Sequence, residues 1–248
     1  MSKHIAMWSC PRSRSTLIFR SFDQRDDCTT YDEPFYPPYL LNNGLDHPYR
    51  DEIVAGKETD YQKVIQQVTD DLPTGIDFSF QKHIAKNILP EYGRDWLKAM
   101  THVFLIRPAD EVIASYYQVN NKVDMHDTGF VELHAIFEEV MALSGKVPIV
   151  IDSNHFLENP EENLKQLCSR LEISFSDKML SWDSDIKGSN ILVDDLSNPA
   201  NAWHSSLMSS TGFMPYKKKQ VILPAELKPL EQQCDQIYQS LYEYCLNK

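Results

Sequence analysis

The sequence has few of the features that mark a membrane, secreted or zinc-binding protein. None of its apolar runs approaches the roughly 18 residues that a membrane-spanning helix needs. The first run, residues 5–8, is followed at once by a serine and a nearby proline, so it is too short for a signal peptide. The five cysteines form neither a C-x-x-C pair nor a Cys/His spacing suited to zinc. We therefore expect a soluble, cytoplasmic protein with reduced thiols and no metal.

Basic charge is also scarce. The chain has 24 Lys and Arg residues against 36 Asp and Glu residues, which gives a formal net charge of −12. An electric field of this sign repels the phosphates of DNA and RNA and the surfaces of anionic membranes. We therefore expect a neutral or cationic small molecule as the partner, and neither a nucleic acid nor a membrane.

What the sequence does have is an alternation of short apolar strands with amphipathic helices. Strands are expected at residues 5–8, 78–80, 103–106 and 147–151, and helices at 15–22, 61–71, 82–89, 110–119, 130–143, after Asn159-Pro160 and around 227–241. Residues 23–60, rich in proline, aspartate and tyrosine, are expected to be irregular and functional. The alternation predicts one α/β domain over residues 1–248, with a central, mainly parallel sheet flanked by helices. In such sheets, ligands bind outside the carboxyl ends of the strands.

The first expected strand leads into a loop with the sequence Cys10-Pro11-Arg12-Ser13-Arg14-Ser15-Thr16. A helix is expected to follow, with Ser13 as its cap, and the free N–H groups of a helix N-terminus favour an anion. Arg12 offers a planar fork to phosphate or sulfate oxygens, while Ser13, Ser15 and Thr16 add donors. A capped helix with surface arginines would give the same pattern. The Walker A pattern G-x-x-x-x-G-K-[ST] is absent, which argues against a GTPase or ATPase of that kind.

This loop resembles the 5′-phosphosulfate loop of the sulfotransferases that use 3′-phosphoadenosine 5′-phosphosulfate (PAPS). That loop reads roughly P-[KR]-S-G-[ST]-T, and Arg14 stands where the family usually has glycine. A bulky residue there, a preceding Trp-Ser pair and a later Asp-Glu-Pro segment resemble a bacterial and plant branch. The resemblance implies a P-loop-like nucleotide fold of the sulfotransferase type, with PAPS as co-substrate and 3′-phosphoadenosine 5′-phosphate (PAP) as product. It implies that the nucleotide contacts Arg12, Ser13, Arg14, Ser15 and Thr16.

A second anion site is expected about 95 residues downstream. Arg107 follows the strand at 103–106, and Ser115 lies eight residues later on the next helix. For either residue alone, a solvated turn or a polar helix face is the simpler interpretation. The pair resembles the R-x-P-x-x-x-x-x-S pattern with which sulfotransferases hold the 3′-phosphate of PAPS, although the proline comes one place early. Two anion sites at two strand ends suit a nucleotide with two separate phosphate groups.

Sulfuryl transfer also needs a base that takes the acceptor's proton, while Arg12 would supply positive charge to the leaving oxygen. Glu33 is the first candidate, because Asp32-Glu33-Pro34 resembles a Glu-Pro stretch near the acceptor site of carboxylate-using sulfotransferases. His83 is the second, since Lys82-His83 loosely resembles the K-x-H of histidine-using members, one residue short. A loop-fastening role for Glu33 and an ordinary surface position for His83 are the alternatives.

The sequence therefore predicts an enzyme that transfers a sulfuryl group from PAPS to a hydroxyl or amine of a small molecule. Two alternatives stay open: a nucleotide-dependent small-molecule kinase and a non-catalytic nucleotide-binding or interaction module on the same fold. The missing Walker lysine argues against the kinase, whereas Arg14 in place of glycine is compatible with the non-catalytic module. Aromatic residues are expected to line the acceptor pocket, unless they belong to the core: Phe35, Tyr36, Tyr39, Tyr49, Tyr116 and Tyr117.

Overall fold

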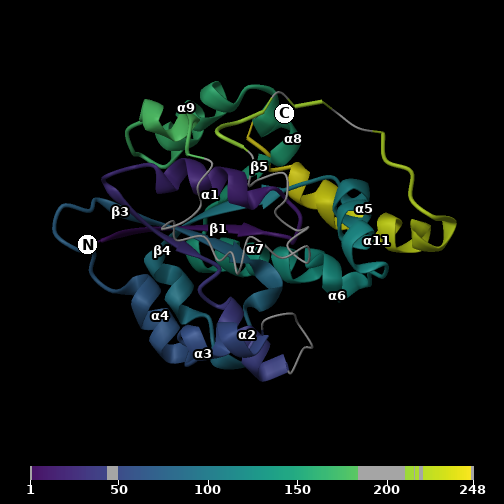
Figure 1. Cartoon of the computed structure of the whole chain (residues 1–248), viewed down its shortest axis with the longest axis horizontal. Coiled ribbons are helices and arrows are strands. Elements are labelled where there is room, and N and C mark those ends of the chain that lie inside the picture. Colours follow the sequence, from purple (N-terminus) through teal and green to yellow (C-terminus); the bar gives the residue numbers. More distant parts are fainter. Residues whose placement is uncertain (1, 44–49, 184–209, 215, 218–219, 247–248) are drawn as a thin grey trace.

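A five-stranded parallel sheet forms the centre of the protein (Figure 1). The computed structural model describes residues 2–43, 50–183, 210–214, 216–217 and 220–246. The strand order is β2-β3-β1-β4-β5, and every neighbouring pair is parallel. The strands are β1 (Lys3–Ser9), β2 (Cys28–Asp32), β3 (Phe78–Ile84), β4 (Met100–Ile106) and β5 (Ile149–Asp152). The predicted α/β fold with a central, mainly parallel sheet is confirmed.

Alternate residues of β1 pack on opposite faces of the sheet, as the period of two in a strand requires. Ile5 and Met7 contact the face covered by α1 (Ser15–Asp23), α8 (Ser153–Glu158) and α9 (Pro160–Arg170). Ala6 and Trp8 contact the other face, which is covered by α4 (Tyr61–Thr69), α5 (Ala109–Asn120), α7 (Phe130–Ser144) and α11 (Lys228–Tyr242). A strand buried on both faces appears in the sequence as a continuous apolar run.

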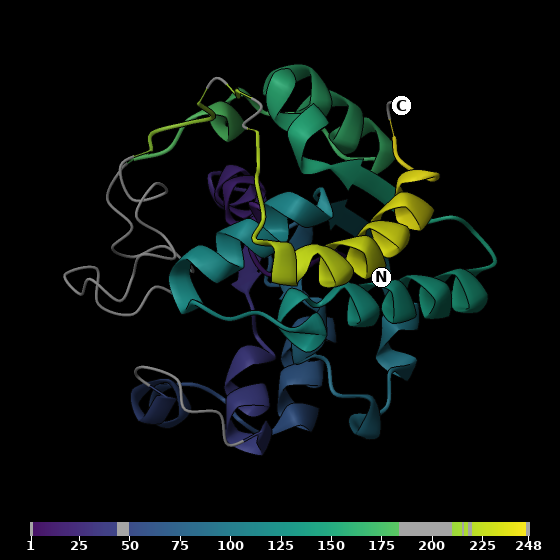
Figure 2. The ribbon, with the colours of Figure 1, turned by 90° about the vertical axis from the view of Figure 1, so that its right-hand side faces the viewer.

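The C-terminal helix α11 completes the second layer. It packs against both α5 and α7, as Figure 2 shows, and its buried side chains are Cys234, Tyr238 and Leu241. Cys234 and Leu241 belong to the apolar stripe that the sequence predicts for this helix, whereas Tyr238 does not. Within the described residues, no helix combines the length and apolar character needed to cross a membrane.

The connections that follow β1 and β4 diverge at the carboxyl edge of the sheet. The chain leaves β1 through α1 on one face of the sheet and leaves β4 through α5 on the opposite face. The connections also run in opposite directions, since β3 and β2 lie on one side of β1 and β4 and β5 on the other. A parallel sheet binds its ligand at such a switch point, so the loops after β1 and β4 take the site position.

Two predictions about local structure were wrong. Residues 23–60 are not irregular throughout, because they contain β2, α2 (Tyr36–Asn43) and α3 (Arg50–Gly56). The edge strand β2 is polar, and the prolines of α2 lie in its first turn, where a missing N–H is tolerated. The helix predicted at 82–89 is instead the end of β3 and a 3-10 turn, Ala85–Asn87. Lys82 is the reason that the sequence does not indicate a strand here: a lysine interrupts the apolar pattern. In the structure, Lys82 is buried because it forms ion pairs with Asp32 and Glu33.

The remaining elements are short and connect the layers. Helix α6 (Met125–Thr128) begins with a capping box formed by Asp124 and Asp127. Four 3-10 turns complete the described structure: Pro90–Tyr92, Asp95–Ala99, Asp177–Leu180 and Ala225–Leu227. The helix predicted after Asn159-Pro160 is α9, with Pro160 at its first turn, although the Asn159 side chain makes no capping hydrogen bond.

Candidate functional site

The loop after β1 holds two arginines in the left-handed backbone conformation. Arg12 and Arg14 each have φ of 64°. Arg14 is the N-cap of α1 and its side chain makes no capping hydrogen bond, so the prediction of Ser13 as the cap was wrong. The Ser13 hydroxyl is completely buried, yet it has no hydrogen-bond partner among the described residues. A buried donor beside uncapped helical N–H groups is the arrangement that a bound anion would satisfy.

The conformation of Arg14 is one that favours glycine, the residue usual at this position in the loop pattern that the sequence resembles. Glycine adopts positive φ at no steric cost, whereas other L-residues are strained there. Arg14 adopts this strained conformation, and its side chain forms two hydrogen bonds. Nη2 donates to Glu111 Oε2 at 2.9 Å, and Nη1 donates to Asn154 Oδ1. The guanidinium also lies over the Tyr216 ring, 5.1 Å from its centroid. Arg14 in place of glycine therefore strains the backbone of the loop but adds side-chain contacts with Glu111, Asn154 and Tyr216.

The strain at Arg14 gives a testable prediction. Arg14→Ala and Arg14→Gly both remove the guanidinium, but only glycine relieves the left-handed conformation. We expect the free energy of unfolding of the glycine variant to exceed that of the alanine variant by about 1 kcal/mol. Urea denaturation of both variants measures this difference. Equal stabilities would show that the backbone at residue 14 carries no strain.

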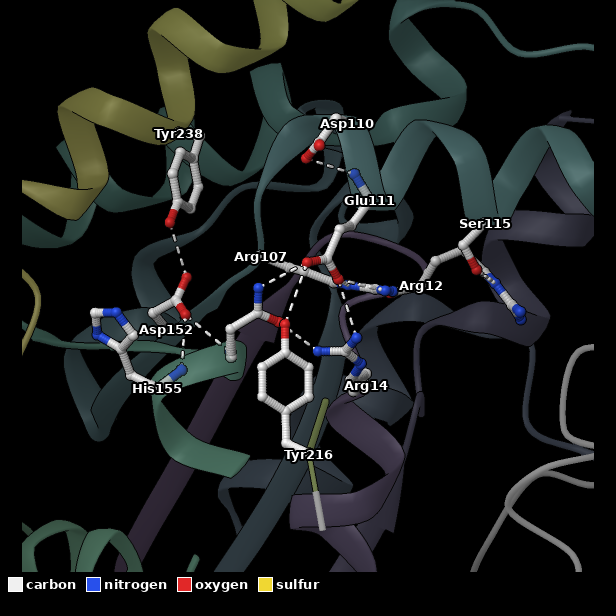
Figure 3. A network of polar contacts seen from close by, with 11 residues as sticks. Arg12, Arg14, Arg107, Asp110, Glu111, Ser115, Asp152, His155, Tyr216 and Tyr238 are labelled. Carbon is white, nitrogen blue, oxygen red and sulfur yellow. Dashed lines mark hydrogen bonds and ion pairs between the residues drawn. The ribbon is translucent and has the colours of Figure 1, made fainter. Parts of the chain in front are cut away.

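The two predicted anion sites lie together in the structure. Arg12 Nε donates to Ser115 Oγ at 3.0 Å, and Arg107 Nη1 donates to the Arg12 carbonyl oxygen at 2.5 Å. The hydroxyl that the sequence pairs with Arg107 thus contacts Arg12 instead. Figure 3 shows Ser115 and Arg12 on one side of this network and Arg107 towards its centre. The residues of the two predicted anion sites are thus connected to each other at the ends of β1 and β4.

Positive charge is concentrated at this site. Burial, and then the neighbouring charge of Arg14, lower the pKa of Arg107 below its ordinary value. Burial, and then the charge of Arg107, lower the pKa of Arg12 in the same way. Both guanidiniums stay protonated at neutral pH, so these directions mean that their charged forms are poorly solvated. An anion bound here would compensate for the lost hydration.

Glu111 is a site residue that the sequence analysis missed. It accepts hydrogen bonds from Arg14 and Arg107 on Oε2 and from Asn154 on Oε1. Burial would raise the pKa of Glu111, but these hydrogen bonds and the arginine charges outweigh it and hold the pKa below its usual value. The spacing of Arg107 and Glu111, four residues apart at the start of a helix, is the signal that could have identified the pair.

A second polar cluster lies at the carboxyl ends of β2 and β3. Lys82 Nζ donates to Asp32 Oδ1 and to Glu33 Oε1, both at 2.7 Å. The side chains of Lys82 and Asp32 are 3% and 2% exposed, whereas that of Glu33 is 19% exposed. Burial, opposed by Lys82 and reinforced by Asp32, raises the pKa of Glu33 above its ordinary value. Glu33 is therefore the carboxylate of this pair that a solvent-side molecule reaches more easily.

Glu33 also has an unusual backbone and neighbour. Its φ is 46°, so a non-glycine residue again occupies the left-handed region, as strained residues at functional sites often do. Asn87 Nδ2 lies 3.5 Å from Glu33 Oε2, and Asn87 Oδ1 is buried without a hydrogen-bond partner in the described part of the chain. Asn87 has no sequence signal of its own, because it follows β3 in a short 3-10 turn.

His83 lies in the core. It is 1% exposed and its ring stacks on Trp8, with centroids 4.5 Å apart. Burial, with smaller contributions from His102 and Lys82, lowers the pKa of His83 to about 3. Its Nε2 is 3.2 Å from Gln81 Oε1. The side chain is neither on the surface nor beside Lys82, because adjacent residues of β3 point to opposite faces of the sheet.

The predicted aromatic pocket is divided between core and polar contacts. Phe35 is 1% exposed and packs in the core against Trp96. Tyr39 contacts His126 Nε2 through its hydroxyl at 3.0 Å, and Tyr116 donates to Asp127 Oδ1 at 2.9 Å. Tyr36 and Tyr117 are half-buried, and Tyr49 lies outside the described residues.

A comparison with known families finds a match that covers most of the chain. A family model described as "Sulfotransferase domain" matches residues 3–225. This range includes the loop after β1, the cluster around Glu33 and the start of α5.

Two curated plant proteins are similar to this chain over most of its length. Branched-chain-amino-acid aminotransferase-like protein 2 of Arabidopsis thaliana is 33% identical over 237 residues, covering 96% of this chain and 41% of the relative. Protein 1 of the same name is 34% identical over 215 residues, covering 86% of this chain and 37% of the relative. The chain thus spans only about two fifths of the length of these proteins.

Solved structures with the same fold share little sequence with this chain. The "Sulfotransferase Domain from the Curacin Biosynthetic Pathway" has a TM-score of 0.57 at 15% identity and covers 95% of this chain and 97% of its own. The "Sulfotransferase Domain from the Synechococcus PCC 7002 Olefin Synthase" has a TM-score of 0.57 at 17% identity and covers 99% and 97%. At these identities the similarity shows the fold alone.

Proposed function

The chain belongs to the sulfotransferase domain family, and we propose that it transfers a sulfuryl group from PAPS to a hydroxyl or amine of a small-molecule acceptor. The observation that supports this most is the convergence of Arg12, Arg14 and Arg107 near the buried hydroxyl of Ser13, which has no hydrogen-bond partner among the residues that the structure describes. We also propose that residues 1–248 act as one domain, since α11, beyond the family match, packs on the same core.

The residues at the two strand ends fit the donor nucleotide. Arg12, Ser13, Ser15 and Thr16 would contact its 5′-phosphosulfate through hydroxyls, the guanidinium and the free N–H groups of α1. Arg107, with Ser115 and Arg14 close by, would hold its 3′-phosphate. The fit rests on the buried Ser13 hydroxyl, which lacks a partner among the described residues, and on the guanidiniums of Arg12 and Arg107, whose pKa values are lowered by burial. When bound, PAPS would supply the sulfuryl group and leave as PAP.

The cluster after β2 would supply the base. A hydroxyl or amine acceptor would bond to sulfur as the bond from sulfur to the phosphate oxygen breaks, and its proton would pass to the carboxylate of Glu33. The raised pKa of Glu33 suits a general base, because proton affinity near the working pH helps transfer. Arg12 would stabilise the negative charge that develops on the leaving phosphate oxygen. His83 is the weaker candidate, because it is buried in the core.

The nucleotide assignment predicts a preference for PAP over ADP. PAP carries the 3′-phosphate that Arg107 would bind, and ADP lacks it, so wild-type protein should bind PAP far more tightly. Arg107→Ala should erase most of this preference while leaving the affinity for ADP nearly unchanged. Titration calorimetry with both nucleotides measures the two affinities.

A thermal-shift comparison of PAP, PAPS, ATP and GTP distinguishes the alternatives. A ligand at a hundredfold excess over its Kd stabilises the folded state by about 2.7 kcal/mol, which gives a clear shift of Tm. Equal affinity for ADP and PAP in the wild type would overturn the proposed function. Stabilisation by ATP but not by PAP would favour the kinase, and PAP binding without transfer would favour the binding module.

A further inference from the structure

Glu111 is the centre of the polar network in the candidate site, as Figure 3 shows. Its Oε2 accepts from Arg14 Nη2 at 2.9 Å and from Arg107 Nε and Nη2 at 2.9 and 2.7 Å. Its Oε1 accepts from Asn154 Nδ2 at 2.7 Å, and the Tyr216 hydroxyl lies 3.4 Å from it. The Glu111 side chain is only 6% exposed. One buried carboxylate therefore joins the arginine of the loop after β1 to the arginine that ends β4.

Asn154, which donates to Glu111, is held in place by residues at the end of a third strand, β5. Asp152, the last residue of β5, caps α8 by accepting from the backbone N–H groups of Asn154 and His155. The Tyr238 hydroxyl of α11 donates to Asp152 Oδ2 at 2.9 Å. The capped turn fixes Asn154, whose side chain donates to Glu111 and accepts from Arg14. The orientation of Glu111 is thus set by a chain of contacts that begins in the core.

This arrangement leaves part of Arg107 for a ligand. A guanidinium has five N–H donors, and three of those on Arg107 go to Glu111 and to the Arg12 carbonyl oxygen. The remaining two, on Nη1 and Nη2, have no partner among the described residues. Without Glu111, the positive charges of Arg14 and Arg107, whose side chains are only partly exposed, would repel each other, as the effect of Arg14 on the pKa of Arg107 indicates. Either side chain would then gain by turning towards water.

We propose that Glu111 is a positioning residue that fixes Arg107 and Arg14 as one unit and thereby sets the preference for a nucleotide with a 3′-phosphate. The proposal rests on the proposed function, because it assumes that Arg107 contacts that phosphate. Its physical basis is preorganisation. A donor pair already held in the binding geometry loses little conformational entropy when the phosphate arrives. The carboxylate also offsets one of the two positive charges, so that both arginines tolerate burial in the free protein.

The test compares Glu111→Gln with Asp110→Asn. Glutamine keeps the size of the side chain but removes the charge, and its amide group cannot accept all the N–H donors that now reach the carboxylate. We expect the affinity for PAP to fall by about 10- to 100-fold, the range for losing charge-assisted hydrogen bonds, and the affinity for ADP to change by less than about threefold. Asp110→Asn removes the same charge one residue away. In the described structure, the Asp110 carboxylate accepts from the Glu111 backbone N–H and makes no ion pair with Arg14 or Arg107, so the preference for PAP should persist.

A second variant covers the case in which Glu111→Gln does not fold. Asn154→Ala leaves every charge in place and removes only the side chain that orients Glu111, so it should lower the preference for PAP over ADP by a smaller factor. If wild-type protein prefers PAP and both variants keep that preference, Glu111 has no positioning role. Tighter PAP binding by Glu111→Gln would also overturn the inference, because Glu111 would then only repel the phosphate. If the wild type itself does not prefer PAP, the proposed function fails instead.

Discussion

Replacing Arg12 with alanine is expected to lower the rate of sulfuryl transfer by about 10²–10³-fold, the scale for losing a donor that stabilises developing negative charge. Arg12 is half-buried at the uncapped N-terminus of α1, and Arg107 donates to its backbone carbonyl. The affinity for PAP should fall by a much smaller factor, because the helix N–H groups, the serines and Arg107 still hold the phosphates. Single-turnover assays with radiolabelled PAPS and an acceptor found by screening hydroxyl and amine compounds measure the rate.

Arg170→Ala is a suitable control for this experiment. Arg170 is exposed in the last turn of α9, away from the carboxyl edge of β1, and its loss changes the net charge by the same amount. Transfer should proceed at the wild-type rate in this variant. A near-normal rate in Arg12→Ala would show that Arg12 only supports the loop.

The second large effect is expected for Glu33→Gln, which should fold, bind PAP and lose sulfuryl transfer. Glutamine cannot take the acceptor's proton, whereas Lys82 keeps its ion pair with Asp32. In wild-type protein, the base must be ionised, and burial raises the pKa of Glu33. The transfer rate should therefore decline as the pH falls through a value above the usual 4.3 or so of a glutamate. Single-turnover rates of both proteins across the pH range measure the effect.

Two variants separate Glu33 from its neighbours. Asp32→Asn removes the other carboxylate that contacts Lys82, and the Asp32 side chain is 2% exposed. His83→Asn removes the second candidate base, which is also buried. Both are expected to lower stability, because both residues are buried, but to keep transfer in the folded fraction. Full activity in Glu33→Gln together with none in His83→Asn would make His83 the base. Activity in both would indicate an acceptor that loses its proton to solvent, such as an amine.

The sequence alone was sufficient to predict the parts of the protein that local patterns encode. Residues 5–8 belong to a strand buried on both faces, and their continuous apolar run is typical of such a strand. The loop that follows carries its charged and hydroxyl groups within seven consecutive residues, so its position before α1 was readable. The same holds for Arg107 at the end of β4. The strand–helix alternation was enough for the fold class, because a parallel sheet needs a crossover between successive strands.

Tertiary structure alone decided how these parts meet. Arg14 and Glu111 are 97 residues apart, Arg14 and Asn154 are 140 apart, and Lys82 and Asp32 are 50 apart. These contacts depend on strand order, which places β1 between β3 and β4, and helical or strand periodicity contains no information about that order. Lys82 misled the sequence analysis for the same reason: its burial in β3 is stabilised by two carboxylates from elsewhere in the chain. Local sequence determines which segments form strands and helices, whereas a charge network is determined by the packing that brings distant segments together.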